Sequence, residues 1–477
     1  MTISDHAPQT NFHSAAMDIL RGRLVAVGSA FTADFNQPII LARAPGRMDI
    51  MGGIADYTGS LVCEMPLGTD AAVAVQKRAD RRLRITTFNA LPDNAPQTVE
   101  LSLDDLYGSG ALISPAAAQA LFANNRWAAY LAGAYWVLAK QRKLNRRASG
   151  ANIACYSEVP LGAGVSSSAA LEVAALCALT RAYHLILDPM ETALLAQRIE
   201  NQIVGAPCGV MDQVASMMGR AEQLLLLKCQ PHTVQGYLDI PPGVTFIGIN
   251  SNVKHSVGGG AYGRTRVAAF MARAIIARLA MRLGARADLT GGYLANVDGE
   301  LYRNQLRLVL PRALSGRDFT RRYGSTGDAA TTVQDDVLYH VRAAADHHVL
   351  ENHRVETFVK VLGQPGAGDA EFARAGRLML ASHASYGQRA KLGSAETDLL
   401  VSALMRAGPG KGIYGAKITG GGSGGTVVAL CRPDARPAVD EACRHYQEKT
   451  HLAPQIITGS GPGAAFTAPV TLRLEGQ

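Results

Sequence analysis

The sequence is poor in several features that would each point to a particular class of protein. Only 2 of its 477 residues are tryptophan, and 6% are aromatic. No apolar stretch approaches about 20 residues without a charge, so no membrane span is expected. Residues 1–12 lack the basic-then-apolar pattern of a secretion signal, and there is no internal repeat or low-complexity tract. These absences favour a cytoplasmic protein without a membrane partner.

Cysteine is also scarce, with seven residues and no C-x-x-C pair. Most of the cysteines lie inside apolar segments, and their number is odd. This usage indicates a reduced compartment and small buried hydrophobic side chains, and it argues against disulfides or a zinc site.

Acidic residues are outnumbered, which gives a formal net charge of +8 and an isoelectric point near 9.1. No aromatic residues are interleaved with the basic ones as they are in nucleic-acid platforms, so we expect a solvated basic surface that attracts anionic substrates, and no nucleic-acid partner. The basic residues gather in four segments: Lys77–Arg84, Lys140–Arg147, Arg264–Arg282 and Arg303–Arg322.

What the chain does contain is glycine, 49 residues of it, in a sequence that is 48% hydrophobic. Its length suits two adjoining cores, and alternating and helical apolar patterns favour an α/β enzyme with many tight turns. Helical apolar patterns predict helices at Ala116–Lys140 and Pro189–Gln202. A crossing between the two halves is expected at Val234–Gly243, before a strand Thr245–Asn250, and a further strand is expected at Thr426–Cys431. Residues 284–365 are the least readable part of the chain.

The glycine segment Gly162-Ala-Gly-Val-Ser-Ser-Ser168 stands between a predicted strand, Ala151–Ser157, and a predicted helix from Ala169. Its backbone N–H groups and the positive end of the helix dipole would suit a phosphate. The segment lacks the G-x-x-x-x-G-K-[ST] pattern, so it brings no lysine of its own. Mg²⁺ would then need one or two protein oxygens, such as Ser168 and a nearby carboxylate. Taken alone, the segment also suits a simple turn with a helix cap.

A second feature favours catalysis. Asp212 lies in an apolar and amide-rich turn, where a carboxylate is costly to bury unless it is paired, and Arg47 in Ala44-Pro-Gly-Arg47 is its natural partner. Such a carboxylate can accept a proton from a sugar hydroxyl while the cation stabilises phosphoryl charge. Taken alone, Asp212 is more simply interpreted as an N-cap aspartate and Arg47 as a surface arginine.

Three segments in this order and spacing resemble the GHMP kinases: Ala44–Tyr57, Pro160–Ser168 and Gly420–Gly425. Within that superfamily the chain is similar to the galactokinase branch through Cys208-Gly-Val-Met-Asp-Gln213 and Asn252-Val-Lys-His255 followed by Tyr262. More narrowly it is similar to the L-arabinokinases, through Arg43–Tyr57, Gly205–Gln213 and His255-Ser-Val-Gly-Gly.

The resemblance implies an α+β, two-domain GHMP kinase fold with the active site in the cleft between the domains. A ribosomal-protein-S5-like, ATP-binding domain would span residues 38–235 after an N-terminal extension, 1–37. A ferredoxin-like C-terminal domain would span 236–477, with an insertion at about 284–365. It further implies an ATP- and Mg²⁺-dependent kinase that phosphorylates the anomeric hydroxyl of L-arabinose.

The resemblance also assigns roles to residues. Asp212 would be the catalytic base, with Arg47 as its electrostatic partner, and Ser168 and Glu200 would hold Mg²⁺. The ATP site would comprise Pro160, Gly162, Ala163, Gly164, Val165, Ser166, Ser167, Ser168, Gly421, Gly422 and Ser423, and the sugar site Asp49, Gly53, Ile54, Asp56, Tyr57, Gly209, Asp212 and Tyr262.

One departure from the galactokinases bears on the substrate. Galactokinases carry Gly-Glu-His-Thr-Asp-Tyr where this chain has Gly52-Gly-Ile-Ala-Asp-Tyr57, and their Glu and His bind the hydroxymethyl group that L-arabinose lacks. Over a pentose these side chains would stay unpaired, at about 1–3 kcal/mol each. Gly53 and Ile54 remove that penalty and predict an apolar wall that favours a pentose.

Other interpretations stay open at this point. The sugar could be galactose or a uronic acid, and an inactive sugar and ATP sensor is a further alternative, although Arg47, Ser168, Glu200 and Asp212 are all present. The protein could be a monomer or a homodimer. Residues 1–37 are too few for the additional N-terminal region of plant arabinokinases, so the kinase portion is expected to stand alone.

Three further features of the sequence are given ordinary structural predictions in preference to functional ones. The histidines His340, His347, His348 and His353 are expected on a solvated helix face and not at a metal. The basic helix Gly263–Leu283 is expected to pack on the C-terminal sheet with its arginines toward solvent. Lys417 suits either a phosphate contact or a strand-edge position equally well.

Overall fold

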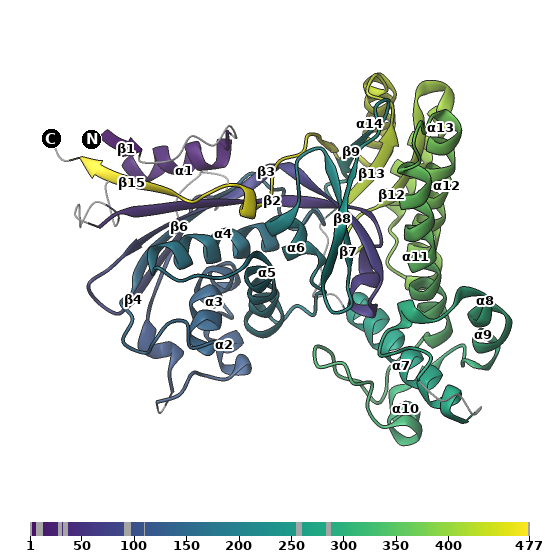
Figure 1. The fold of residues 1–477 in the computed structure, drawn as a ribbon, viewed down its shortest axis with the longest axis horizontal. Coiled ribbons are helices and arrows are strands. Elements are labelled where there is room, and N and C mark those ends of the chain that lie inside the picture. Colours follow the sequence, from purple (N-terminus) through teal and green to yellow (C-terminus); the bar gives the residue numbers. More distant parts are fainter. Residues whose placement is uncertain are drawn as a thin grey trace.

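The computed structural model describes residues 2–5, 13–26, 31, 37–89, 97–108, 110–253, 260–282 and 288–475. A large sheet runs along one half of the molecule, and a smaller sheet with long helices forms the other (Figure 1). The large sheet has the order β1-β15-β2-β3-β6-β4-β5, and β7 and β8 extend from β3. Its strands are β1 (Thr2–Asp5), β2 (Ile39–Met51), β3 (Leu61–Lys77), β4 (Arg82–Thr87), β5 (Gln97–Ser102), β6 (Ala151–Ser157), β7 (Gln223–Lys228), β8 (Thr233–Asp239) and β15 (Val470–Glu475).

Helices cover both faces of this sheet, which explains why β2 is buried at every residue. Because successive strand residues point to opposite faces, Ile39 and Leu41 pack with α1, whereas Ile40 and Ala42 pack with the helices of the other face. Those helices are α2 (Pro115–Leu121), α3 (Arg126–Lys140), α4 (Ser167–Ala182), α5 (Pro189–Arg198) and α6 (Met211–Met218), and α1 is Ala15–Ala26.

The smaller sheet has the order β12-β13-β9-β14 and is antiparallel throughout. Its strands β9 and β13 have the predicted bounds, Thr245–Asn250 and Thr426–Cys431. Apolar residues of the sheet pack against the helices beside it. The other elements of this half are β12 (Ile413–Ile418), β14 (Gln455–Ile457), α12 (Asp369–Ser385), α13 (Ala395–Ala407) and α14 (Arg436–Thr450).

The described part of the predicted insertion, residues 288–365, packs on the basic helix α7 (Gly260–Arg282) and forms a core of its own. The prediction for α7 was wrong in its packing and for two of its arginines. The helix lies against α11 (Val341–Leu362), and Arg266 and Arg273 bond to residues 326–328, whereas Arg264 and Arg278 are exposed as expected. Buried carbonyl and carboxylate acceptors in these loops account for the difference. Smaller elements here are α8 (Gly299–Leu301), α9 (Arg307–Val309), α10 (Gly316–Tyr323), β10 (Leu314–Ser315) and β11 (Leu338–Tyr339).

The chain returns to its first sheet at the end. β15 pairs with β2 and also with β1, so the two termini lie side by side in Figure 1. The final strand therefore belongs to the large sheet, and the boundary predicted after residue 235 falls within β8, which pairs with β7. A helix expected over Ala116–Lys140 is divided into α2 and α3, because Asn124 and Asn125 favour a turn.

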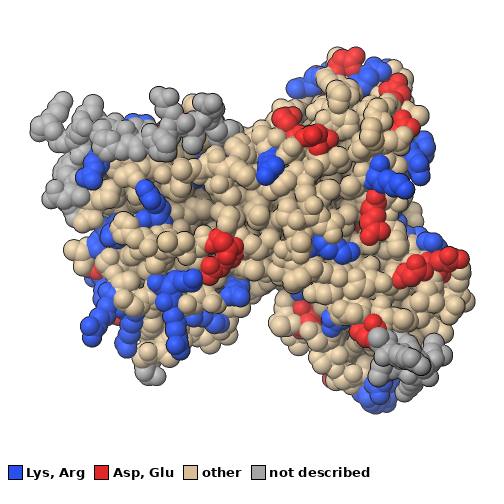
Figure 2. All heavy atoms as spheres, in the orientation of Figure 1, with Lys and Arg blue, Asp and Glu red and all other residues tan. Residues whose placement is uncertain are grey.

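Two of the basic segments, Lys77–Arg84 and Lys140–Arg147, converge on one lobe. Arg81 donates to the Arg146 carbonyl oxygen, and lysine and arginine side chains gather over this region in Figure 2. Acidic residues interleave with them, as in the Arg81–Asp104 pair at 2.9 Å. No helix among the described residues is long and apolar enough to cross a membrane.

Candidate active site

The loop between β6 and α4 adopts an anion-binding shape. The residues Gly162, Gly164 and Ser166 have φ values of 70°, 72° and 60°, and they alternate with residues of negative φ. This alternation turns successive backbone N–H groups toward one concave side. Ser167 and Ser168 follow in the first turn of α4, at the positive end of its dipole. The loop and the helix together form a cradle for a phosphate-sized anion.

Arg47 is held against this loop by an irregularity in β2. The pairing of β2 with β3 shifts register between Pro45 and Arg47. Gly46 permits close approach there, since a Cβ at this position would lie 2.7 Å from the Val165 carbonyl oxygen. The Arg47 amide donates to that same oxygen at 3.1 Å, and its Nη1 donates to the Gly164 carbonyl at 2.9 Å. The Ala-Pro-Gly-Arg sequence thus fixes Arg47 to the loop Gly162–Ser168, called the anion loop below.

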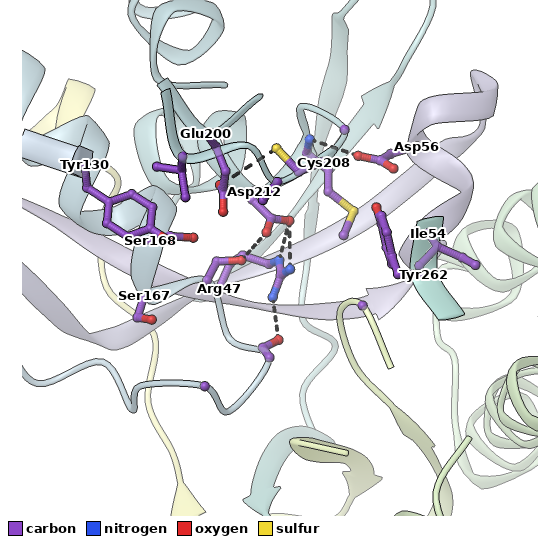
Figure 3. Close-up of a pocket in the computed structure, with 18 of the residues that line it drawn as sticks. Arg47, Ile54, Asp56, Tyr130, Ser167, Ser168, Glu200, Cys208, Asp212 and Tyr262 are labelled. Carbon is purple, nitrogen blue, oxygen red and sulfur yellow. Dashed lines mark hydrogen bonds and ion pairs between the residues drawn. The ribbon is translucent and has the colours of Figure 1, made fainter. Parts of the chain in front are cut away.

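Asp212 lies in the first turn of α6 and pairs with Arg47 (Figure 3). The Arg47 Nη2 and Nε atoms lie 2.7 and 3.0 Å from one Asp212 oxygen, Oδ1. The Ser166 hydroxyl donates to the other, Oδ2. Three donors orient this carboxylate beside the anion loop, although the chain separates Arg47 from Asp212 by 165 positions.

A second carboxylate, Glu64 on β3, lies behind Arg47 with its Oε2 3.3 Å from Arg47 Nε. Burial by itself would lower the pKa of the Arg47 guanidinium, but the charges of Asp212 and Glu64 outweigh it and raise that pKa. Burial raises the pKa of Glu64 well above its usual range, and the neighbouring Asp49 adds to this effect. Arg47 is therefore a permanent cation between carboxylates.

Glu200 and Ser168 face each other across the same cavity (Figure 3). The predicted helix Pro189–Gln202 is α5 followed by a π-helical segment, η3 (Ile199–Val204), that carries Glu200. Such π segments are frequent at functional sites. Burial, and next the charge of Asp212, raise the pKa of Glu200 to about 7. A buried carboxylate next to a hydroxyl can supply two oxygens to a hard cation.

Asp56 marks the other end of the cavity. Gly209 packs so closely on Asp56 that a Cβ at this glycine would lie 1.6 Å from Oδ2, and the Met211 amide donates to the same oxygen at 3.4 Å. Burial, with the charge of Asp212 second, raises the pKa of Asp56 to about 7. Ile54 and Tyr262 line this end as well, so it combines one carboxylate with apolar walls.

The third glycine segment closes over the anion loop from the C-terminal half. A Cβ at Gly420 would lie 2.4 Å from the Gly164 carbonyl oxygen, and one at Gly425 would lie 2.6 Å from that of Ala163. Both glycines have positive φ. Thr426 donates its hydroxyl to the Ala163 carbonyl at 2.8 Å, so the two glycine segments form one packed unit.

The cavity has a volume of about 240 Å³ and joins both halves of the chain. Of the residues predicted from sequence, it is lined by Arg47, Ile54, Asp56, Gly162, Gly164, Ser166, Ser167, Ser168, Glu200, Gly209, Asp212, Tyr262 and Gly421. The structure does not bring Asp49, Gly53, Tyr57, Pro160, Ala163, Val165, Gly422 or Ser423 to its surface.

Three of these absences have clear physical causes. Asp49 is fully buried, with Oδ2 2.5 Å from Lys417 Nζ and Oδ1 accepting the Gly53 amide at 2.8 Å. Gly53 packs against the Tyr386 hydroxyl, the atom nearest to the position its Cβ would take, and does not line the cavity. The Tyr57 ring is enclosed, and its hydroxyl lies 3.2 Å from His348 Nε2. These residues support the site from behind.

Two simpler predictions were wrong in part. Lys417 lies on the edge strand β12, as one of its two interpretations had it, but it is fully buried in its pair with Asp49 and does not line the cavity. His347 and His348 are fully buried and bonded to Ser385 and Tyr57, and burial lowers the pKa of both imidazoles. Among the described residues, no group of three or more His, Cys, Asp or Glu side chains could hold a metal.

The sequence interpretation missed Arg126 and Tyr130, which line the cavity near Glu200. Both lie on one face at the start of α3, four residues apart. Arg126 also donates to the Val204 carbonyl at the end of η3. The only signal in the sequence was an arginine and an aromatic at helical spacing, which is common on ordinary helices.

Comparisons with known proteins agree with this geometry. The GHMP kinases N terminal domain matches residues 129–220, the GHMP kinases C terminal domain matches 369–448, and the galactokinase galactose-binding signature matches 29–77. L-arabinokinase of Arabidopsis thaliana is 37% identical over 92% of this chain. The chain covers 47% of that relative, about half its length.

Solved structures show the same fold. Lactococcus lactis galactokinase, complexed with galactose, has a TM-score of 0.71 at 20% identity and covers 96% of this chain and 100% of its own. A Methanococcus jannaschii mevalonate kinase has a TM-score of 0.53 at 13% identity, with 91% and 98% covered. The chain belongs to the GHMP kinases. Within that superfamily it carries the galactokinase signature and is similar to L-arabinokinase.

Proposed function

We propose that the protein is an ATP-dependent sugar 1-kinase that converts L-arabinose to L-arabinose 1-phosphate. The observation that carries the proposal is the Arg47–Asp212 pair, at 2.7 Å, next to the anion loop Gly162–Ser168 in one cavity. A base with a fixed cation, placed beside a phosphate cradle, provides what phosphoryl transfer to a hydroxyl requires.

In the proposed reaction, the amides of Gly162–Ser168 and the α4 dipole bind the phosphates of ATP. Asp212 accepts the proton of the anomeric hydroxyl as its oxygen forms a bond to the γ-phosphorus. The bond from that phosphorus to the bridging oxygen of ADP breaks, and Arg47 stabilises the charge on the transferring group. The products are ADP and the sugar 1-phosphate.

Mg²⁺ is proposed as the metal, with Ser168 and Glu200 as its protein ligands. Two oxygens suit this ion, because Mg²⁺ keeps several waters and completes its coordination with substrate phosphates. Glu200 is buried and acidic, so a cation beside it would offset the cost of its charge. Bound there, Mg²⁺ would neutralise phosphate charge.

L-arabinose is favoured by the turn η1 (Gly53–Thr58), which carries Ile54 and Asp56. Ile54 lines the cavity and packs with Tyr262 and Tyr386 in an apolar cluster. At position 53 a side chain has no space, because its Cβ would lie 1.5 Å from the Tyr386 hydroxyl oxygen. A galactokinase-like Glu at this position would therefore require Tyr386 to move as well. We propose that this wall rejects the hydroxymethyl group of a hexose.

D-galactose is the second candidate, because the galactokinase galactose-binding signature matches residues 29–77. An ADP-release assay over L-arabinose, D-galactose and D-glucuronate, with Mg²⁺ or with EDTA, separates the candidates. We expect Mg²⁺-dependent release with the highest kcat/KM for L-arabinose, and phosphorus NMR of the product should show an anomeric phosphate. Absence of sugar-dependent release with all three sugars would contradict the kinase proposal, and a preference for galactose would select the second candidate.

Substitution of Ile54 tests the specificity argument. Ile54→Ala is expected to raise kcat/KM for D-galactose relative to L-arabinose by about tenfold or more, since a methylene-sized space is worth about 1–3 kcal/mol in such pockets. Ile418→Ala is the matched control, because Ile418 belongs to the same apolar cluster but does not line the cavity. It should lower stability and leave the sugar ratio unchanged. An equal change of the ratio in both variants would contradict a specific role for Ile54.

A further inference from the structure

Arg266 on α7 joins three segments that are distant in the sequence. Its Nε and Nη2 atoms donate to the two carboxylate oxygens of Asp328, both at 2.8 Å. Its Nη1 donates to the carbonyl oxygens of Pro207 and Cys208 at 3.2 and 3.3 Å. The side chains of Arg266 and Asp328 are 8% and 4% exposed, so the pair is buried, and a bidentate pair of this kind has a fixed geometry.

The two carbonyls belong to the turn that leads into α6 and Asp212. The next residue, Gly209, packs directly on the Asp56 carboxylate, and the Met211 amide donates to Asp56 Oδ2 at 3.4 Å. A displacement of Pro207 and Cys208 would therefore move a wall of the cavity at its Asp56 end. Arg266 itself is not among the residues that line this cavity.

The same guanidinium supports the turn that carries Asp56. Its carbon Cζ lies 4.8 Å from the centroid of the Tyr57 ring, in a cation–π contact. His348 of α11 bonds to the Tyr57 hydroxyl at 3.2 Å and to the Thr58 hydroxyl at 3.1 Å. The segment 288–365 thus contacts the turn that carries Asp56 directly through His348. It reaches the Pro207–Cys208 turn through the pair of Asp328 with Arg266.

We propose that the segment 288–365 positions the sugar-binding end of the active site, and that Arg266 and Asp328 are the positioning pair. The inference rests on the proposed function for the identity of that end. Within the described residues, the ion pair of Asp328 with Arg266 is the only carboxylate–guanidinium pair that connects this loop to α7. The Asp328 side chain also accepts the Thr331 hydroxyl at 2.6 Å and the Ala330 amide at 3.2 Å, so the loop is built around it.

The segment 288–365 contains another ion pair, Arg307–Asp346, that does not contact the site and therefore serves for comparison. Arg307 donates to both oxygens of Asp346 at 2.8 and 3.0 Å. This pair has the same bidentate geometry, but neither residue lines the cavity or bonds to the turns at Asp56. Arg307→Lys is therefore the control for Arg266→Lys, at a pair with the same geometry in which the Arg307 side chain is 42% exposed.

The experiment compares Arg266→Lys, Asp328→Asn and Arg307→Lys with the wild type, using steady-state kinetics with sugar and with ATP as the varied substrate. For Arg266→Lys and Asp328→Asn we expect a loss of about 10- to 100-fold in kcat/KM for the sugar, the scale of effects from small misplacement of a site. KM for ATP should stay close to wild type. Thr331→Ala, which removes one hydroxyl bonded to Asp328, gives a milder change in the same direction should Asp328→Asn not fold.

Hydrogen exchange supplies a readout that does not depend on activity. The Cys208 amide donates to Asn201 at 2.9 Å and the Met211 amide to Asp56, so both should exchange faster in Arg266→Lys and Asp328→Asn but not in Arg307→Lys. If the wild type is inactive on every sugar, the proposed function fails, and hydrogen exchange alone then tests the positioning role of Arg266 and Asp328. The inference is overturned by unchanged exchange at both amides, or by equal losses for sugar and ATP.

Discussion

Asp212→Asn is expected to lower kcat by about 10²- to 10⁴-fold, the usual contribution of a positioned base, while KM for the sugar changes little. The amide has the shape of the carboxylate but cannot accept the proton of the anomeric hydroxyl. The Arg47 and Ser166 donors that now bond to Asp212 would hold the asparagine near the same place, so sugar binding should persist. Steady-state kinetics and isothermal titration with the sugar measure the two effects.

Ser166→Ala is the control for this variant, because it removes one hydrogen bond to Asp212 Oδ2 and leaves the carboxylate. We expect a smaller loss of kcat than in Asp212→Asn. A near-normal rate in Asp212→Asn would remove Asp212 from its role as base. Loss of sugar binding in that variant would instead assign Asp212 mainly to binding.

Arg47→Met is expected to lower both stability and activity. Removing one partner of a buried ion pair costs about 3–5 kcal/mol, and here both Asp212 and Glu64 lose their cation. An arginine that stabilises a transferring phosphoryl group is worth about 10³- to 10⁵-fold in kcat. Urea unfolding measures the first effect, and kcat at saturating ATP and sugar measures the second.

The double variant Arg47→Met with Glu64→Gln separates these effects. The neutral amide at position 64 removes one of the unpaired buried carboxylates, so part of the stability should return while kcat stays low. Arg43→Met is the matched control, since Arg43 lies on the same strand in an equally buried pair with Asp70, at 2.8 Å, away from the cavity. It should lose stability without the specific loss of kcat. Recovery of kcat in the double variant would contradict a catalytic role for Arg47.

Local features of the fold were predicted well from the sequence. The strands at Thr245–Asn250 and Thr426–Cys431 have their predicted bounds, since short apolar runs between turn residues specify their own ends. The anion loop and the helix after it also lie where they were expected. In each case the information is contained within a few neighbouring residues.

Burial of polar residues was predicted poorly. His347 and His348 were expected on a solvated helix face, and Lys417 at a phosphate or a strand edge. All three are fully buried, because their partners Ser385, Tyr57 and Asp49 are brought to them by other elements. A polar residue enters a core only where a partner satisfies it. Sequence spacing does not show such partners.

The sequence by itself identified the residues to which the proposed chemistry is assigned: the glycine loop Gly162–Ser168, the proposed base Asp212 and its cationic partner Arg47. Only the tertiary structure decided which candidates reach one cavity, because a sheet that pairs β2 with β3 and packs α6 beside β2 brings Arg47 within 2.7 Å of Asp212. The tertiary structure also buries Asp49 in its pair with Lys417 and bonds Tyr57 to His348, so that neither residue lines the cavity. It places Arg266 in hydrogen bonds to the Pro207–Cys208 turn. Local patterns fix loops and helices, whereas contacts between distant segments depend on the whole packed core.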